Sequence, residues 1–301
     1  MSVMSAIYGG GPFYTGGQAV IDDLKASQFT TVVAWAMHIQ ANADLVFNDP
    51  TNVLVQNGAY AGDPAWPGLL ADLKQGQTSV NRLIFSVGGW GVQDFPNLKQ
   101  LIFPSPSDYP NNPQTGTGTV LYQNFAALKA AIPTIDAIDF DDETLYDEPT
   151  TIAFANMLYA IGFNVTFCPY TNTSFWTNCL KALNTATPGL VTGFNLQCYA
   201  GGAGNDPSSW ISAIQTAMGS GFDAAGFVFP GLWCINGNGC SQGQCPSSIQ
   251  STFAGWKSTG IGGGFIWLYD DIQKCEGSGA CGGGVAMGSQ AYADAIINGL
   301  S

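Results

Sequence analysis

Basic side chains are scarce in this sequence. Its 301 residues include eight Lys and Arg, one His and 21 Asp and Glu, which gives a formal net charge of −13. Nucleic acids and anionic membrane surfaces are therefore not expected as partners. No apolar run reaches the roughly 18 residues that a membrane-spanning helix needs. Because no feature demands an interface, we expect a globular monomer.

The cysteine spacing typical of a zinc site is also missing. None of the eight Cys falls in a Cys-x-x-Cys pair, so we expect no structural zinc and no metal or cofactor. Their even number is typical of an oxidising compartment, and we expect disulfides, with Cys275 to Cys281 as the most local pair. Buried free thiols are the alternative. No signal peptide is visible in the first eleven residues, although the acidic, Cys-rich composition favours an extracellular location.

Short apolar, β-branched runs alternate with segments of helical spacing along the whole chain. The predicted strands are Met4–Tyr8, Thr31–Met37, Leu83–Val87, Ala137–Asp141, Val165–Pro169, Gly193–Tyr199, Gly226–Phe229 and Gly264–Leu268. The predicted helices are Ala19–Ser27, Gly68–Lys74, Val120–Ala131, Thr151–Ile161, Phe175–Leu183, Ser209–Met218, Ser247–Trp256 and Gln290–Ile297.

Eight βα units in about 300 residues favour an α/β fold, a single (β/α)₈ TIM barrel that forms one domain over residues 1–301. No Gly-x-Gly-x-x-Gly lies between a strand and a helix, so a dinucleotide site is not supported. Two stretches, Ile39–Pro67 and Pro104–Thr119, are expected to be long irregular loops on the functional face. Between the last two strands there is space for a Cys-rich loop and one helix, and thus for no large insertion domain.

The fourth predicted strand carries a row of acids. Side chains alternate along a strand, so Asp139, Asp141 and Glu143 share one face while Ile138 and Phe140 take the other. In a barrel packed against helices, the acids should point inwards. Carboxylates so close together cannot all ionise freely, and at least one pKa should be raised. A carboxyl group kept protonated near neutral pH is what a general acid requires.

Other chemistries fit this pattern less well. A solvated acidic surface or a calcium or magnesium site would not normally alternate with Ile and Phe in a central strand. A Ser-His-Asp triad would have to use His38, the only histidine, but no Gly-x-Ser-x-Gly elbow is present. We expect His38 to be an ordinary loop or rim residue.

The residues Asp136-Ala-Ile-Asp139-Phe-Asp141-Asp-Glu143 resemble the Asp-x-x-Asp-x-Asp-x-Glu signature of glycoside hydrolase family 18, which includes chitinases and endo-β-N-acetylglucosaminidases. The position after the first Asp is usually Gly in the family and is Ala137 here. Ser86-Val-Gly88-Gly89 resembles the family's Ser-x-Gly-Gly motif. Gln197-Cys-Tyr199 and Gly264-Phe-Ile-Trp267 are similar to later strands of the family.

This resemblance implies a role for each matching residue. Glu143 is the general acid and later the base that activates water. Asp141 orients the substrate's 2-acetamido group, whose carbonyl attacks the anomeric carbon, and Asp139 shares a proton with it. Tyr199 donates a hydrogen bond to the acetamido oxygen, and Trp267 lies at the floor of the site.

Further residues are expected to bind the sugar or to support the site. The substrate-binding candidates are Trp267, Gln197, Trp90, Trp35 and Trp233. Asp136 is expected to make structural hydrogen bonds, and Ser86, Gly88 and Gly89 to serve packing. Trp176, Trp210 and Trp256 fall on predicted helices and should pack in the core.

The sequence thus predicts a retaining glycosidase acting on β-1,4-linked N-acetylglucosamine, in chitin or in the N-glycan core of a glycoprotein. These two substrates stay open. A non-catalytic carbohydrate-binding or inhibitor protein on the same barrel is the alternative, and the presence of Glu143 argues against it.

Overall fold

A computed structural model describes residues 3–301 of the chain. The chain divides into two compact units, which are described one at a time. Unit 1 contains the segment up to Ala34 together with Ala71–Leu83 and Phe194–Ser301. Unit 2 contains Trp35–Leu70 and Ile84–Gly193.

The strand order confirms the predicted barrel. Within residues 3–301, hydrogen bonds join the strands in the order β1-β11-β10-β9-β8-β7-β6-β2, and a further pairing of β1 with β2 closes the ring. Eight strands with helices between them form a (β/α)₈ barrel. All eight predicted strands are present, with ends that differ from the expected ones by up to four residues.

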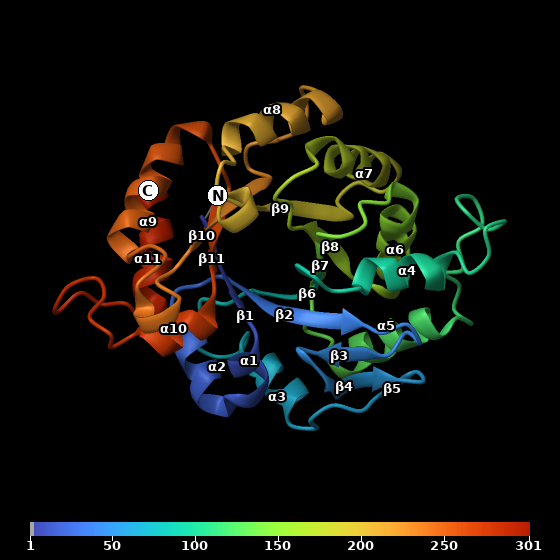
Figure 1. Cartoon of the computed structure of the whole chain (residues 1–301), viewed down its shortest axis with the longest axis horizontal. Helices are drawn as coiled ribbons and strands as arrows, with labels where there is room; N and C mark the ends of the chain where they lie inside the picture. Colours follow the sequence, from blue (N-terminus) through green and yellow to red (C-terminus); the bar gives the residue numbers. More distant parts are fainter. Residues whose placement is uncertain (1–2) are drawn as a thin grey trace. The chain divides into compact units, whose positions relative to one another are not determined.

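Unit 1 holds the first strand and the last part of the barrel. Helices α9 and α11 pack against each other, and α11 also covers β11 (Figure 1). Strand β1 pairs in parallel with β11, with Ala6 opposite Phe265. The elements of this part are β1 (Met4–Gly9), α1 (Gly11–Thr15), α2 (Gly17–Ala26), β9 (Val191–Gln197), α8 (Pro207–Met218), β10 (Val228–Trp233), α9 (Pro246–Trp256), β11 (Gly263–Trp267), α10 (Tyr269–Cys275) and α11 (Ser289–Leu300).

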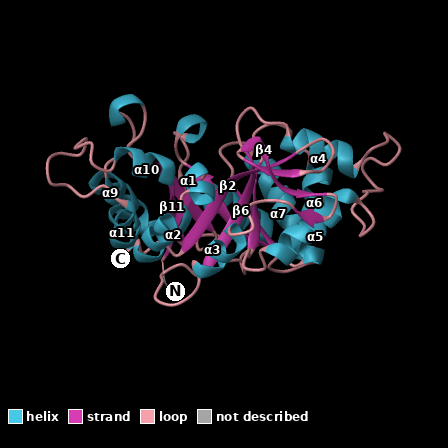
Figure 2. Cartoon of the chain, turned by 90° about the horizontal axis from the view of Figure 1, so that it is seen from below, coloured by secondary structure: helices cyan, strands magenta, loops and turns pink. Residues whose placement is uncertain are grey.

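Unit 2 holds the acidic strand and its neighbours. Helix α6 packs against both α5 and α7 (Figure 2). Asp147 caps the start of α6, and Gly162 ends it in the left-handed conformation. The elements that lie wholly or mostly in this unit are β2 (Thr31–Ile39), β3 (Leu45–Phe47), β4 (Asp49–Gln56), β5 (Ala59–Tyr60), α3 (Trp66–Asp72), β6 (Arg82–Gly88), α4 (Asp94–Ile102), α5 (Val120–Ala131), β7 (Ala137–Asp141), α6 (Glu148–Ile161), β8 (Asn164–Phe167) and α7 (Thr173–Ala186).

The prediction that Ile39–Pro67 is an irregular loop is wrong. Strands β3, β4 and β5 extend β2 into an antiparallel sheet within this stretch. Asn57 and Gly58, both with positive φ, form the two-residue turn between β4 and β5. Asn-Gly is the preferred sequence for such a hairpin turn, so the sequence does contain a local signal for this hairpin. The stretch Pro104–Thr119 is irregular as expected, but it joins α4 to α5 rather than following a strand directly.

The expected bond between Cys275 and Cys281 is also wrong. The disulfides are Cys240–Cys275 and Cys245–Cys281, with Cα atoms 5.6 and 5.7 Å apart. They tie the loop after β10 to the end of α10 at Cys275 and to the following loop at Cys281, and this cluster also contains Ile235 and Met287. Nearness in sequence was a poor guide, because these two loops are close in space while about 35 residues apart in sequence. The four other cysteines, Cys168, Cys179, Cys198 and Cys234, belong to neither of these disulfides.

Other expectations about chain organisation are confirmed. Between β10 and β11 lie the disulfide-linked loop, α9 and two short 3₁₀ turns, with no insertion domain. Trp176 and Trp210 lie on helices and are buried. Over residues 3–301, no helix has the length and apolar character needed to cross a membrane.

The disulfide pairing can be tested by peptide mapping. Cleavage after Lys and Glu without reduction should yield one species in which three peptides, residues 182–257, 275–276 and 277–301, are joined by two bonds. Mass spectrometry would identify it, and thiol titration of the denatured chain should count the four other cysteines. A species joining 275–276 to 277–301 without 182–257 would contradict the structure.

Candidate active site

The acids of β7 lie as the alternation predicts. Asp139 is fully buried and stands in register with Ser86 of β6 and Thr166 of β8. Ser86 Oγ donates to Asp139 Oδ2 at 2.8 Å, and Thr166 Oγ1 donates to Oδ1 at 2.6 Å. On the opposite face, the Phe140 ring stacks on Phe154 of α6 with centroids 5.0 Å apart. The apolar side therefore faces the helices, and the acidic side faces away from them.

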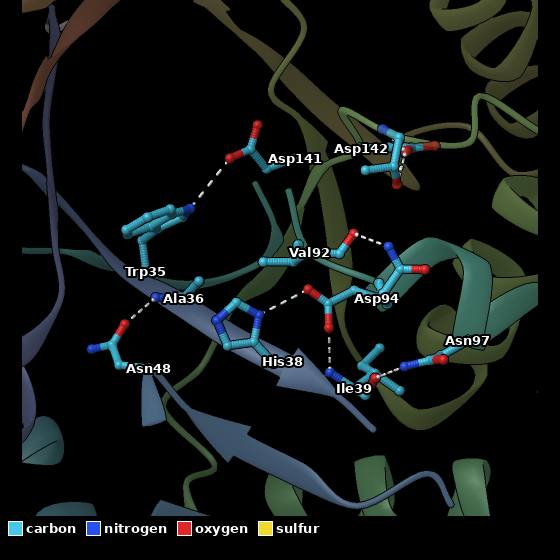
Figure 3. Close-up of polar contacts among 12 residues, drawn as sticks. Trp35, Ala36, His38, Ile39, Asn48, Val92, Asp94, Asn97, Asp141 and Asp142 are labelled. Atoms are coloured by element: carbon cyan, nitrogen blue, oxygen red, sulfur yellow. Dashed lines mark hydrogen bonds and ion pairs between the residues drawn. The ribbon is translucent and has the colours of Figure 1, made fainter. Parts of the chain in front are cut away.

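Asp141 ends β7 and is 2% exposed. The indole Nε1 of Trp35 on β2 donates to Asp141 Oδ2 at 3.2 Å (Figure 3). Burial raises the pKa of Asp141 well above its usual value, and the negative charges of Glu143 and Asp139 raise it further, whereas the Trp35 hydrogen bond opposes the shift. The predicted rise of at least one pKa in the row is confirmed in direction, and Asp141 retains a proton at higher pH than an ordinary Asp.

Asp142 shapes the turn that carries Glu143, a role that the sequence reading missed. Its Oδ1 accepts from the backbone N–H groups of Thr144 and Leu145, and its Oδ2 accepts from that of Tyr146 at 2.8 Å. Burial nevertheless raises the pKa of this carboxyl group. The available signal was an Asp followed two residues later by Thr, which favours a turn closed by the Asp side chain. Glu143 itself is partly buried.

The two glycines of the Ser-x-Gly-Gly motif permit close approaches. A Cβ on Gly88 would lie 2.2 Å from the carbonyl oxygen of Asp141, and Gly89 N–H donates to that oxygen at 2.7 Å. A Cβ on Gly89 would meet the Trp35 ring at 3.1 Å. Both glycines have positive φ, 113° and 118°. They therefore serve packing, as predicted, while Ser86 has a further role as a hydrogen-bond donor.

The end of β2 is fastened by a buried carboxylate (Figure 3). Asp94, the first residue of α4, accepts from the backbone N–H of Ile39 at 2.6 Å and pairs with His38 Nδ1 at 2.8 Å. Asn97 of the same helix donates to the carbonyl of Ile39. The expectation that His38 is a loop or rim residue is wrong, because it lies within β2 and its side chain is only 18% exposed.

Aromatic residues cluster at the carboxyl ends of β9, β10 and β11 in unit 1. Tyr199 follows β9, while Trp233 and Trp267 are the last residues of β10 and β11. Tyr199 stacks on both Trp rings, with centroids 5.5 and 5.7 Å apart. Gln197, the last residue of β9, is 6% exposed. Four residues expected to act on the sugar are thus gathered at the strand ends of one unit.

Trp90 has a different environment. It follows Gly89 directly, beyond the end of β6, and 85% of it is exposed. A Trp this exposed, next to a buried acidic strand, gives up the free energy of burial that a core Trp would gain. Its place in the chain fits a binding surface better than a packing role.

Asp147 anchors the Pro104–Thr119 stretch to the turn after β7. Its Oδ1 accepts from Lys99 Nζ at 2.8 Å and from Tyr109 OH at 3.0 Å, while its Oδ2 accepts from Thr150 at the start of α6. Burial would raise the pKa of Asp147, but the hydrogen bonds from Lys99, Thr150 and Tyr109 together outweigh it, so that the pKa is lowered. The Asp147 carboxylate, four residues after Glu143, thus holds both the start of α6 and the loop that contains Tyr109.

Comparison with known proteins gives matches in structure only. No family model and no curated protein sequence matches the chain. The Group IV chitinase of Ostrinia furnacalis has a TM-score of 0.61 and 13% identity, with both chains covered completely. ChiB, a family 18 chitinase of Flavobacterium johnsoniae, has a TM-score of 0.58 and 12% identity over 98% of this chain and 94% of its own.

A third similar structure is active domain 2 of a thermostable Pyrococcus furiosus chitinase, with a TM-score of 0.61 and 9% identity over 99% of this chain and 95% of that one. All three similar structures are chitinases, and ChiB is described as a family 18 enzyme. The resemblance seen in the motifs thus agrees with the fold, and at these identities the comparison concerns the fold alone.

Because Gly88 lies so close to Asp141, replacing Gly88 by Ala should destabilise the protein more than the same replacement at a glycine in open space. Gly88→Ala should lower the free energy of unfolding by about 3 kcal/mol or more, because its Cβ overlaps a backbone carbonyl. Gly91→Ala, also at positive φ but in open space, should cost only about 1 kcal/mol. Urea denaturation measures both, and equal losses would contradict the packing described.

Asp147→Ala should lower the free energy of unfolding by about 2 kcal/mol at pH 7, from the lost helix cap and the lost ion pair. Because the folded-state pKa of Asp147 is lowered, its contribution is present above about pH 4 and is lost as the pH falls through the folded-state pKa. The difference from wild type should therefore narrow in acid.

Asp206→Ala is the matched control, since Asp206 caps α8 through the Ser208 N–H. It should cost about 1 kcal/mol. Denaturant titrations across pH compare the two variants, and an Asp147→Ala loss no larger than that of Asp206→Ala would exclude an anchoring role.

Proposed function

We propose that this chain is a retaining glycoside hydrolase that cleaves β-1,4 linkages in glycans containing N-acetylglucosamine, with residues 1–301 acting as one catalytic domain. The observation that carries the proposal is the buried acidic face of β7, where Asp139 and Asp141 lead to Glu143, two residues beyond the end of the strand. The likeness of the fold to chitinases supports it, including a structure of the Ostrinia enzyme with allosamidin.

The proposed reaction follows from the chemistry of these groups. Glu143, as a carboxylic acid, donates its proton to the glycosidic oxygen while the bond from that oxygen to the anomeric carbon breaks. The substrate's acetamido carbonyl oxygen forms a bond to the same carbon, giving an oxazolinium ion. The Glu143 carboxylate then takes a proton from water, and the oxygen of that water attacks the anomeric carbon while the bond from this carbon to the acetamido oxygen breaks, which restores the acetamido group and the original configuration.

Asp141 orients the acetamido group and balances the positive charge that develops on it. Burial and the neighbouring carboxyl groups raise the pKa of Asp141, and from the family motif Asp139 shares a proton with it. Asp139 is fixed for that role by Ser86 and Thr166. From the family motif, Tyr199 donates to the acetamido oxygen and Trp267 stacks on the sugar, with Gln197, Trp233 and Trp90 as further binding residues.

The substrate is either a chitooligosaccharide or the di-N-acetylchitobiose core of an N-glycan. The missing insertion between β10 and β11 favours an open groove, which suits both. A crystal of the Pyrococcus chitinase contains chito-oligosaccharides. We further propose an oxidising, extracellular location, which the two disulfides support, and a monomeric state.

Glu143→Gln should lower kcat by about 10²- to 10⁴-fold, because Gln cannot donate the required proton. Glu148→Gln is the matched control, since Glu148 begins α6 and accepts a hydrogen bond from Asn178 that Gln can also accept. The control should keep wild-type turnover. Product release from chitooligosaccharides and from a high-mannose glycoprotein, followed in parallel by mass spectrometry, measures both variants.

The product pattern separates the possibilities. Shortened oligosaccharides would identify a chitinase, whereas a single N-acetylglucosamine left on Asn would identify an endo-β-N-acetylglucosaminidase. Wild-type turnover by Glu143→Gln would overturn the proposed mechanism. Binding of chitooligosaccharides by the wild-type chain without any product would overturn the enzyme proposal in favour of a carbohydrate-binding protein.

A further inference from the structure

Trp35 does more than offer an aromatic face. Its indole Nε1 lies 3.2 Å from Asp141 Oδ2, so its only polar atom is directed at the acidic strand (Figure 3). The ring edge lies against Gly89, where even a Cβ would come within 3.1 Å. The side chain is thus confined between β6 and the carboxyl group that it contacts.

Hydrogen bonds from the turn between β3 and β4 hold the backbone next to Trp35. Asn48 lies between β3 and β4 in the left-handed conformation, with φ of 57°. Its Oδ1 accepts from the N–H of Ala36 at 3.0 Å, and its own N–H donates to the carbonyl of Ala36 at 2.9 Å. The antiparallel extension of β2 therefore fastens the residue that follows Trp35.

A carboxylate in this position needs such a donor. The negative charges that act on Asp141 come from Asp139, Asp142 and Glu143, and all of them disfavour its ionised form. Trp35 is the hydrogen-bond donor that acts in the opposite direction. An indole N–H donates and cannot accept, so it favours the ionised oxygen over a hydroxyl at Oδ2. A proton on Asp141 is thereby directed to Oδ1.

We propose that Trp35 is a positioning residue for Asp141, holding Oδ2 of its carboxyl group so that Oδ1 is the oxygen that exchanges a proton and meets the acetamido group. This inference rests on the proposed function for its catalytic meaning. The hydrogen bond itself is independent of it. A stacking role for Trp35 against the sugar is replaced by this one.

The first test needs no substrate. In protein labelled with ¹⁵N at the Trp indoles, Trp35→Phe identifies the Trp35 resonance, and this signal should titrate with pH as Asp141 ionises. In Asp141→Asn the titration should disappear. Trp210 is the matched control, because its indole donates over the same 3.2 Å to Asn205, an uncharged amide, so its signal should be insensitive to Asp141. A Trp35 signal that does not titrate in the wild-type chain would overturn the proposal.

The second test measures catalysis. Trp35→Phe keeps an aromatic ring but loses the donor, so the pKa of Asp141 should rise. If activity requires ionised Asp141, the acidic limb of the kcat profile should move to higher pH by about one pH unit, and kcat should fall about tenfold with KM little changed. Trp210→Phe should leave the profile unchanged. A rise in KM at constant kcat and an unmoved acidic limb would instead indicate a stacking residue.

The two tests fail separately. If the wild-type chain hydrolyses neither glycan, the proposed function is wrong, while the indole titration still decides whether Trp35 holds Asp141. If Trp35→Phe does not fold, Asn48→Gly supplies a second variant, because it keeps the left-handed backbone and removes the Oδ1 contact to Ala36. It should move the acidic limb in the same direction by a smaller amount, and an unmoved limb would contradict the role of the hairpin.

Discussion

The structure around the candidate site depends on the burial of two carboxyl groups on one face of a central strand. Asp139 and Asp141 are almost fully removed from water, which is costly unless each oxygen finds a donor or retains a proton. Donors come from the two strands that pair with β7, with Ser86 on β6 and Thr166 on β8, and from Trp35 on β2, one strand further away. The acidic strand therefore constrains the polar residues of its neighbours.

The same constraint reaches the backbone. Gly88, the last residue of β6, lies against the carbonyl of Asp141, and Gly89, which follows it, leaves room for the Trp35 ring to approach. Asn48 then secures the chain next to Trp35 from the β3–β4 turn. In physical terms, the two glycines of the Ser-x-Gly-Gly motif leave the space in which the Trp35 indole reaches the buried Asp141.

Much of the fold and of the acidic strand could be predicted from the sequence, because the spacing of apolar residues indicates which side chains are buried. Alternation of Ile138 and Phe140 with the acids was sufficient to place the carboxyl groups on one face, and recurring strands and helices were sufficient to predict the barrel. For Trp35 the sequence predicts only an aromatic face that could stack on a sugar, because the pattern does not show where an indole N–H points. Only the fold brings it to Asp141.

The disulfides and the hairpin were missed for different reasons. Pairing of Cys240 with Cys275 depends on two distant loops meeting, which no local pattern encodes. The hairpin did have a local signal in Asn57 and Gly58, but it lay in a stretch rich in turn residues that favoured a loop assignment. Local structure can therefore be predicted from the sequence where a pattern repeats, whereas a single contact between distant segments cannot.

Burial opposes full ionisation of the acids at this site. Seven of the 21 acidic residues fall within residues 136–148, yet burial raises the pKa of both Asp141 and Asp142. In the proposed reaction a neutral glycan binds first and positive charge develops only as the bond breaks. In this proposed reaction the carboxyl groups share protons before the bond breaks. Their negative charge then lies beside the oxazolinium ion as it forms, so they stabilise the transition state more than the bound substrate. Burial is thus the property that makes this acidity useful for catalysis.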